Sequence, residues 1–381
     1  MKLTDDWLTA PATQAVMQML ETAGHQAFFV GGCVRNAALG APVSDLDIAT
    51  DAPPQSVITL ANAAGLKPIP TGIEHGTVTV VSDHIPHEIT TFRRDEETDG
   101  RHALVAFSTE IAEDAARRDF TMNALYARSD GEVLDPLGSG LADLQARHLR
   151  FVGEAEDRIR EDYLRILRFF RFTAWYGAPE NGPDAEGLAA CAALAEGIDG
   201  LARERIGAEM RKLLAAPDPA PVIASMAQTG ILSRLLPGAD AKALPVLIHL
   251  ENGRGPDPLR RLACLTSQPA TAALRLSRAE AKRLARLREA AQDIGSPTEM
   301  GYRLGVEDGC DAWLVRAALL EMPMTPDWPA QIAFGAAQTF PVTARDLLPA
   351  LQGKELGDKL AELEIRWIGS GFTLDRAHLL G

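Results

Sequence analysis

Two aspartates separated by one residue, Asp45 and Asp47, are the side chains of this sequence best suited to hold a metal ion. In an extended strand both carboxylates point to one face, while Leu46 and Ile48 point to the other. Two carboxylates this close repel each other unless a cation lies between them, and Mg²⁺ binds through one or two carboxylates plus water and phosphate oxygens. Solvated strand acids show the same D-x-D pattern, so the neighbouring segments must decide its meaning.

A glycine pair, Gly31 and Gly32, precedes the aspartates and is followed by Arg35. Glycines that close a strand let the backbone approach a phosphate, and a helix beginning near Cys33 would direct N–H groups at that anion. Arg35 would add a charge-assisted contact. The alternative interpretation is that the two glycines form only a turn.

A third carboxylate, Glu88, lies in the second of two strand-like runs, residues 76–81 and 87–92. These runs predict a hairpin that turns across residues 83–86. From a neighbouring strand, Glu88 could orient or deprotonate an attacking hydroxyl. An acid on an exposed edge strand would give the same pattern, and the sequence favours neither interpretation.

Two arginine-rich segments follow a charged stretch, residues 95–101, that is typical of a loop beside a site. In the first segment, Arg118 can bind a triphosphate, and Asp119 can accept from a ribose hydroxyl or cap a helix. In the second segment, residues 159–171, Glu161 and Asp162 lie four and three residues before Arg165, which is the spacing of side-chain pairs along one helical flank. An aspartate beside a fixed arginine matches the edge of a base, so this flank could select a nucleotide. A salt-bridged surface helix is the alternative.

The elements that must position these residues change in character along the chain. Within residues 1–150, short strand-like runs alternate with helices, which predicts strands at residues 27–30, 46–50, 78–82, 87–92 and 133–134. Beyond residue 141 the spacing of apolar residues predicts helices instead, at residues 163–176, 203–214 and 220–236. Clusters of Gly, Pro and Asp mark joints at residues 177–184, 216–221 and 253–258. The sequence therefore predicts an α/β head followed by helical modules.

Composition limits the partners of this protein. The chain has 381 residues with a net charge of −14, enough length for two or three domains but an unfavourable charge for binding RNA. Residues 1–150 hold 11 basic and 21 acidic side chains, and residues 151–381 hold 27 and 31. An RNA site would therefore be a local basic surface. One basic run at helical spacing could grip an RNA backbone or form a solvated face: Arg275, Arg278, Lys282, Arg283, Arg286 and Arg288.

Other classes of protein are not indicated. The sequence contains no apolar run that could cross a membrane, and residues 1–11 are not a basic-then-apolar leader, so we expect a cytoplasmic protein without a membrane partner. The four cysteines are scattered and form no C-x-x-C pair, which indicates neither a zinc knuckle nor disulfides. We expect all four to be packing residues: Cys33, Cys191, Cys264 and Cys310.

Taken in order, the motifs G-G-x-V-R, D-x-D, R-R-D-F-T-x-N-A and E-D-x-x-R-x-x-R resemble the class II nucleotidyltransferases, which include bacterial CCA-adding enzymes and bacterial poly(A) polymerases. The resemblance covers residues 28–172. It implies an α+β fold, with a polymerase-β-like catalytic head at residues 1–150. An all-α neck at residues 151–216 and a helical body and tail at residues 217–381 would follow and hold the tRNA acceptor arm. The implied reaction is template-independent, Mg²⁺-dependent addition of C, C and A to the tRNA 3′ end from CTP and ATP, with release of pyrophosphate.

The resemblance also assigns roles to single residues. Asp45 and Asp47 match the metal-binding pair, and the phosphate-binding segment is matched by Gly31, Gly32 and Arg35. The residues that match the nucleotide-contacting and base-selecting motifs are Arg118, Asp119, Glu161, Asp162, Arg165, Arg168 and Arg171. Asn36 stands where the family usually has Asp, which predicts a neutral hydrogen bond in place of an ion pair. The C-terminal half has only His249 and His378, so the phosphatase activity of some relatives is not expected.

Two other functions compete with CCA addition. A poly(A) polymerase, or an enzyme adding only C or only A, would share every motif. Poly(A) polymerases of this family usually carry a strongly basic extension, whereas residues 372–381 are nearly neutral, which favours a tRNA substrate. A catalytically silent RNA-binding protein is the third possibility, and the retained aspartates and arginines argue against it.

Overall fold

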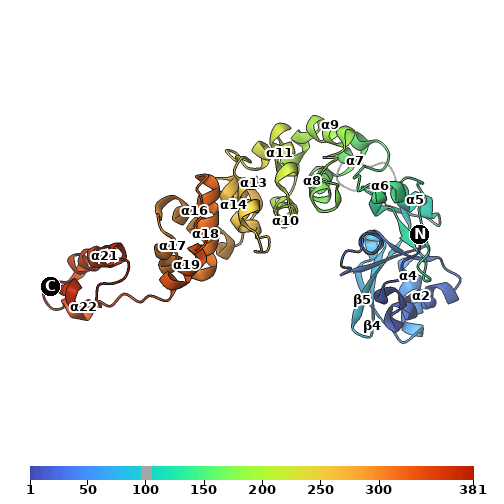
Figure 1. The fold of residues 1–381 in the computed structure, drawn as a ribbon. Coiled ribbons are helices and arrows are strands. Elements are labelled where there is room, and N and C mark those ends of the chain that lie inside the picture. Colours follow the sequence, from blue (N-terminus) through green and yellow to red (C-terminus); the bar gives the residue numbers. More distant parts are fainter. Residues whose placement is uncertain (96–104) are drawn as a thin grey trace. The chain divides into compact units, whose positions relative to one another are not determined.

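The computed structural model describes residues 1–95 and 105–381, so most of the charged stretch predicted as a loop lies outside the described residues. The chain forms two compact units. Figure 1 shows their helices and strands coloured along the sequence. Unit 1 comprises Met1–Glu209 with Gln228–Ile231, and unit 2 comprises Met210–Ala227 with Leu232–Gly381. The boundary falls inside helix α10 (Arg203–Leu214), and the division into head, neck and body stays a prediction. Within the described ranges, no helix is long and apolar enough to cross a membrane.

A mixed seven-stranded sheet forms the centre of the N-terminal part of unit 1, in the order β3-β4-β5-β2-β1-β8-β9. Strands β2 and β5 pair in parallel, and every other neighbouring pair is antiparallel. The bounds are β1 Ala27–Val30, β2 Leu46–Thr50, β3 Lys67–Gly72, β4 Thr77–Ser82, β5 Ile85–Thr91, β8 Tyr126–Ala127 and β9 Val133–Leu134. All five strands expected from the sequence are confirmed, within two residues at their ends. The short strands β6 (Arg93–Asp95) and β7 (Val105–Phe107) form a separate pair.

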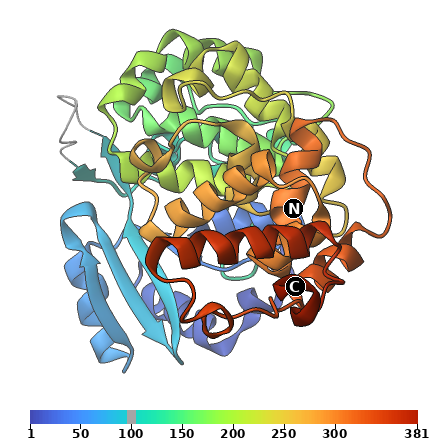
Figure 2. The same cartoon turned by 90° about the vertical axis from the view of Figure 1, so that its left-hand side faces the viewer.

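The predicted hairpin is confirmed as β4 and β5, which lie side by side in Figure 2. Asp83 and His84 form the two-residue turn with φ angles of 46° and 64°, the backbone that a tight hairpin requires. Along β5 the faces alternate. His87 is buried and contacts Thr13 of helix α2 (Pro11–Thr22), whereas Glu88 is exposed on the opposite face. The hairpin therefore directs Glu88 away from the α2 side of the sheet.

Helices make up the rest of unit 1: α1 (Asp6–Thr9), α3 (Gly32–Ala38), α4 (Pro54–Ala63), α5 (Ile111–Ala116), α6 (Gly140–Gln145), α7 (Ala155–Glu161), α8 (Leu164–Tyr176) and α9 (Ala185–Ala193), with part of α10. Helix α8 is amphipathic and buries an apolar stripe that includes Leu167 and Phe170. An aromatic cluster fixes it to the preceding loops, since the rings of Phe120 and Phe151 lie 4.9 Å apart and those of Phe151 and Phe169 lie 5.4 Å apart.

Unit 2 is helical throughout its described elements. Its main helices are α11 (Ala220–Gln228), α13 (Leu244–Leu250), α14 (Pro258–Leu265), α16 (Arg278–Asp293), α17 (Pro297–Leu304), α18 (Val306–Leu319), α19 (Trp328–Ala336), α21 (Gly353–Gly369) and α22 (Arg376–Leu380). The single helix predicted for residues 220–236 is wrong, because the chain breaks before α12 (Ile231–Leu235) at Gly230, whose φ is 76°. All four cysteines are buried, as expected of packing residues, and none forms a disulfide.

Buried ion pairs join the helices of unit 2. Arg260 and Arg261 are each 2% exposed, and both donate to Glu251. Asp311 of α18 also accepts from Arg260, at 2.8 Å. Arg283 pairs with Asp257, Asp308 and Asp311. This arginine, predicted as a candidate for RNA contact, is therefore engaged within the protein.

Candidate active site

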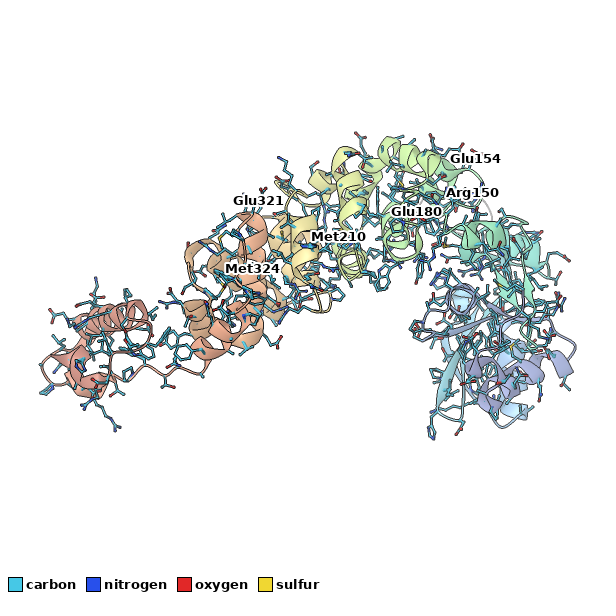
Figure 3. All side chains as sticks on the ribbon, in the orientation of Figure 1. Arg150, Glu154, Glu180, Met210, Glu321 and Met324 are labelled. Carbon is cyan, nitrogen blue, oxygen red and sulfur yellow. The ribbon has the colours of Figure 1, made fainter. Side chains whose placement is uncertain are left out.

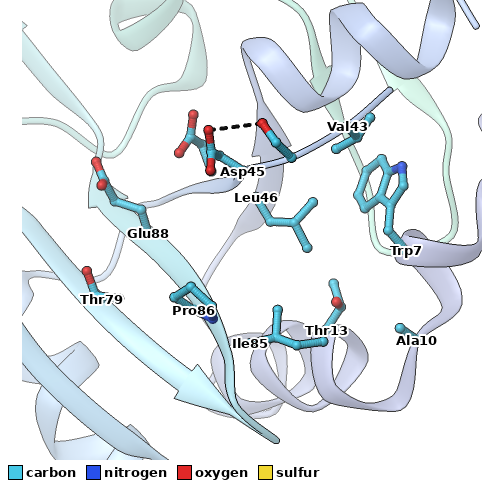
Figure 4. Close-up of a pocket in the computed structure, with 12 residues that line it drawn as sticks. Trp7, Ala10, Thr13, Val43, Asp45, Leu46, Thr79, Ile85, Pro86 and Glu88 are labelled. Atoms are coloured by element: carbon cyan, nitrogen blue, oxygen red, sulfur yellow. Dashed lines mark hydrogen bonds between the residues drawn. The ribbon is translucent and has the colours of Figure 1, made fainter. Parts of the chain in front are cut away.

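Three carboxylates share one face of the sheet. Asp47 of β2 and Glu88 of β5 are direct register partners in the parallel pair, and Asp45 lies two residues before Asp47. The predicted alternation is present, since Leu46 and Ile48 are buried while Asp45 is exposed and Asp47 is half-buried. The three side chains border a cavity of about 370 Å³ whose far wall includes Trp7 (Figure 4).

The electrostatics of Asp47 indicate a place for a cation. Burial raises the pKa of Asp47 to about 6, and the charges of Glu88 and Asp45 add to that shift, against the opposing charge of Arg118. A bound cation would relieve this repulsion and return the carboxyl to its ionised form. Among the described residues there is no ready-made cage of three or more ligands. Two oxygen donors beside an open cavity nevertheless fit Mg²⁺, which keeps several waters and substrate oxygens as ligands.

The glycine pair lies at the end of β1, where Gly31 is beside Arg118. Gly31 has a φ of 72°, and a side-chain Cβ at this position would lie 3.4 Å from Nη1 of Arg118. Gly32 begins helix α3, close to the predicted start near Cys33. The positive φ favours glycine at position 31, whereas an added Cβ would make only ordinary van der Waals contact with Arg118.

Arg35 lies inside the protein, although the sequence predicted a phosphate contact. It is 6% exposed and donates to Asn36, Asn123 and the hydroxyl of Tyr176. Its guanidinium also lies 4.0 Å from the centre of the Tyr176 ring. As expected, Asn36 makes a hydrogen bond in place of an ion pair: its neutral side-chain oxygen accepts from Arg35, while its amide donates to the carbonyl of Pro42. In this structure Arg35 joins α3 to the end of α8.

Asp119 connects the R-R-D segment to α8. It accepts from Arg168 and, at 3.0 Å, from the side chain of Asn123. Burial alone would raise the pKa of Asp119, but Arg168 and Asn123 outweigh burial and hold the pKa below its ordinary value. The alternative role of helix cap is wrong, because only a 3₁₀ turn (Thr121–Asn123) follows and Asp119 does not cap it. Asp119 is thus a fixed anion at the junction with α8.

The segment expected as one helical flank is divided in two. Helix α7 ends at Glu161, and Asp162 is extended before α8 begins. The predicted pair of Glu161 with Arg165 is confirmed. Asp162 instead pairs with Arg205 of α10 at 2.6 Å, and it accepts from the backbone N–H of Leu164.

Two partners on α10 could not be found from the sequence. Arg205 is 43 residues from Asp162, and Glu209, which pairs with Arg171, is 38 residues from that arginine. Glu209 is 6% exposed, so the Arg171 pair is an internal link between α8 and α10. Helical spacing carries no signal for partners this distant.

Comparisons with known proteins agree with this site and fold. Residues 27–150 match the family described as the poly A polymerase head domain, and residues 183–242 match the probable RNA and SrmB-binding site of polymerase A. The CCA tRNA nucleotidyltransferase 1, mitochondrial, of Mus musculus is 31% identical over 394 residues, covering 96% of this chain and 88% of that protein. The chain belongs to the class II family of CCA-adding enzymes and poly(A) polymerases.

Other members of this family show the same relationship. The CCA-adding enzyme of Geobacillus thermodenitrificans is 40% identical over 229 residues, covering 60% of this chain and 54% of that protein. The structure of the Bacillus stearothermophilus CCA-adding enzyme in complex with CTP superimposes with a TM-score of 0.67 at 29% identity, over 92% of this chain and 88% of that one. The Thermotoga maritima CCA-adding enzyme complexed with tRNA shares the fold, with a TM-score of 0.69 at 17% identity, over 100% of this chain and 98% of that one. The predicted α+β fold class is confirmed.

Proposed function

We propose that this protein is a CCA-adding enzyme that adds C, C and A to the 3′ end of tRNA from CTP and ATP. The proposal rests on one observation above all. The three carboxylates Asp45, Asp47 and Glu88 border one cavity, within a chain whose family relationship extends over nearly its whole length. The relatives named for CCA addition, and the related structures with CTP and tRNA, support the choice of substrates.

The carboxylates would serve the transfer of the nucleotide. Asp45 and Asp47 would hold Mg²⁺, which when bound supplies positive charge beside the reacting phosphate. Glu88, on the neighbouring strand, would orient the RNA 3′-hydroxyl and accept its proton as it attacks the α-phosphate. Pyrophosphate then leaves.

The arginine segments would hold and select the nucleotide. The backbone of Gly31 and Gly32 and the guanidinium of Arg118 would bind the triphosphate. The base edge would hydrogen-bond to Asp162 and Arg165. Glu161 holds Arg165 in place through an ion pair. No nucleic-acid template is needed for this choice.

The remaining residues of these motifs would act through α8. Arg168 fixes Asp119, while Arg35 and Arg171 link α8 to α3 and to α10. We therefore propose that these three arginines hold α8 in place and do not contact the nucleotide directly.

The helical unit would hold the tRNA. Arg283 is tied to three aspartates and Arg286 lies 3.4 Å from Asp308, so we assign RNA contact to other basic side chains of unit 2. We place the protein in the cytoplasm, where tRNA and both nucleotides are available.

A single incubation tests the function. The purified protein is mixed with Mg²⁺, CTP, ATP and a tRNA transcript that lacks its last three nucleotides, and the extended 3′ ends are sequenced. Addition of C, C and A followed by a stop is the expected result. Long A tracts would indicate a poly(A) polymerase, a single type of nucleotide a partial enzyme, and no extension a silent RNA-binding protein.

A further inference from the structure

Both arginines of the R-R-D segment converge on one buried carboxylate, Asp114, in helix α5. Its side chain is 1% exposed. One oxygen accepts two hydrogen bonds from Arg117, at 2.9 and 2.5 Å. The other accepts from Nη2 of Arg118 at 2.9 Å and from the hydroxyl of Tyr126 at 2.7 Å. Four hydrogen bonds thus satisfy the carboxylate completely.

Tyr126 completes the arrangement from the other side. It is fully buried on strand β8, where it is the register partner of Val30, the residue before Gly31. Its hydroxyl accepts from Nε of Arg118 at 3.0 Å while donating to Asp114. Two elements, α5 and β8, therefore hold the same guanidinium.

These contacts fix the direction of Arg118. Asp114 accepts from Nη2 and Tyr126 accepts from Nε. The remaining nitrogen, Nη1, lies beside Gly31, 3.4 Å from where a Cβ added to Gly31 would lie. Burial would raise the pKa of Asp114, but Arg118 and Arg117 outweigh burial and lower the pKa to about 2. The carboxylate is therefore ionised at every pH at which the enzyme would work, and the hold on Arg118 persists.

We propose that Asp114 and Tyr126 are positioning residues that aim Nη1 of Arg118 at the triphosphate of the incoming nucleotide. The inference deepens the proposed function and rests on its assignment of the triphosphate to the Gly31–Gly32 turn. A flexible arginine loses side-chain entropy when it binds a ligand, and holding it in advance removes most of that loss. CTP and ATP carry the same triphosphate, so the pair acts equally on both and takes no part in choosing the base.

The test compares Asp114→Asn and Tyr126→Phe with the wild type in steady-state extension of a tRNA transcript. For Asp114→Asn we expect the KM values for CTP and ATP to rise by the same factor, about tenfold or more, because a charge-assisted hydrogen bond is lost. Competitive inhibition by inorganic tripolyphosphate should weaken in parallel. The KM for tRNA and the preference for C or A at each step should stay unchanged. Tyr126→Phe should show the same pattern at about threefold to tenfold.

A matched control is available in the same unit. Asp143 is also buried, but it holds Arg150, labelled in Figure 3, and Thr121 rather than Arg117 or Arg118. Asp143→Asn should lower the melting temperature and leave the nucleotide KM values and tripolyphosphate inhibition within about twofold.

Three results would overturn the proposal. The first is unchanged KM values for CTP and ATP in Asp114→Asn. The second is an equal change of nucleotide KM and tripolyphosphate inhibition in the Asp143 control, since general loosening would then explain both. The third is a change for only one of the two nucleotides. If Asp114→Asn does not fold, Tyr126→Phe decides the question by the same criteria. Titration calorimetry of CTP and tripolyphosphate needs no RNA extension. A protein that binds CTP but extends no tRNA would refute the proposed function, and the affinity of Asp114→Asn for CTP and tripolyphosphate, lowered or unchanged, would still support or overturn this inference.

Discussion

Replacing Asp47 by Asn should stop nucleotide incorporation and at the same time stabilise the protein in the absence of metal. The loss of incorporation follows from removing one of the two proposed metal ligands. The gain in stability follows because burial, Glu88 and Asp45 all disfavour a charge at this position. Asn has nearly the same shape as Asp but carries no charge, so neither burial nor the two neighbouring carboxylates destabilise it.

The magnitude comes from the shift of the pKa of Asp47 from 3.8 to about 6. A carboxyl whose pKa is higher in the folded than in the unfolded protein binds its proton more tightly when folded, so the wild type loses stability as pH rises from about 4 to about 6. Two pKa units correspond to about 3 kcal/mol. Because Asp47 is only half-buried, solvent screening reduces the expected gain to about 1–2 kcal/mol above pH 7, and to nothing near pH 4.

Urea unfolding in EDTA at pH 4 and pH 7.5 measures the gain, and hydrogen exchange of peptides covering β2 and β5 assigns the transition to unit 1. Adding Mg²⁺ should stabilise the wild type and not Asp47→Asn, since only a protein that binds the ion gains from it. Asp83→Asn serves as a control, because it removes a charge from the exposed turn of the neighbouring hairpin. A wild type more stable than Asp47→Asn at pH 7.5 in EDTA would refute this reasoning.

Three further substitutions test other parts of the site and fold. Arg165→Ala should reduce the discrimination between CTP and ATP more than it weakens tRNA binding, and misincorporation assays that find an unchanged preference would support the surface-helix alternative. Glu88→Gln should lower kcat by about tenfold to a hundredfold or more with little change in either KM, as expected of a lost general base, and an unchanged kcat would make Glu88 a spectator. In unit 2, Glu251→Gln should lower the free energy of unfolding by about 3–5 kcal/mol, because it removes the anion that two buried arginines share. A loss of less than about 1 kcal/mol in chemical denaturation would contradict the stabilising role of these ion pairs.

The elements that carry the proposed metal site could be predicted because their signals are local. A two-residue period placed Asp45 and Asp47 on one face, and turn residues between two strand-like runs predicted the hairpin that carries Glu88. The elements that were missed lack such signals. Strand β3 is an exposed edge strand that contains Pro68 and Pro70, which only an edge position tolerates.

The partners of the arginines were decided only by tertiary structure. The sequence determined that Arg35, Arg118, Arg165, Arg168 and Arg171 are present at spacings suited to anions. It did not determine which anions they meet inside the protein, because those partners come from other elements. Asp114 and Tyr126 fix Arg118, and Glu209 holds Arg171. Periodicity fixes the face on which a side chain lies, whereas the packing of distant segments fixes what lies opposite it, and only the second distinguishes an arginine free to meet a nucleotide from one that holds the site together.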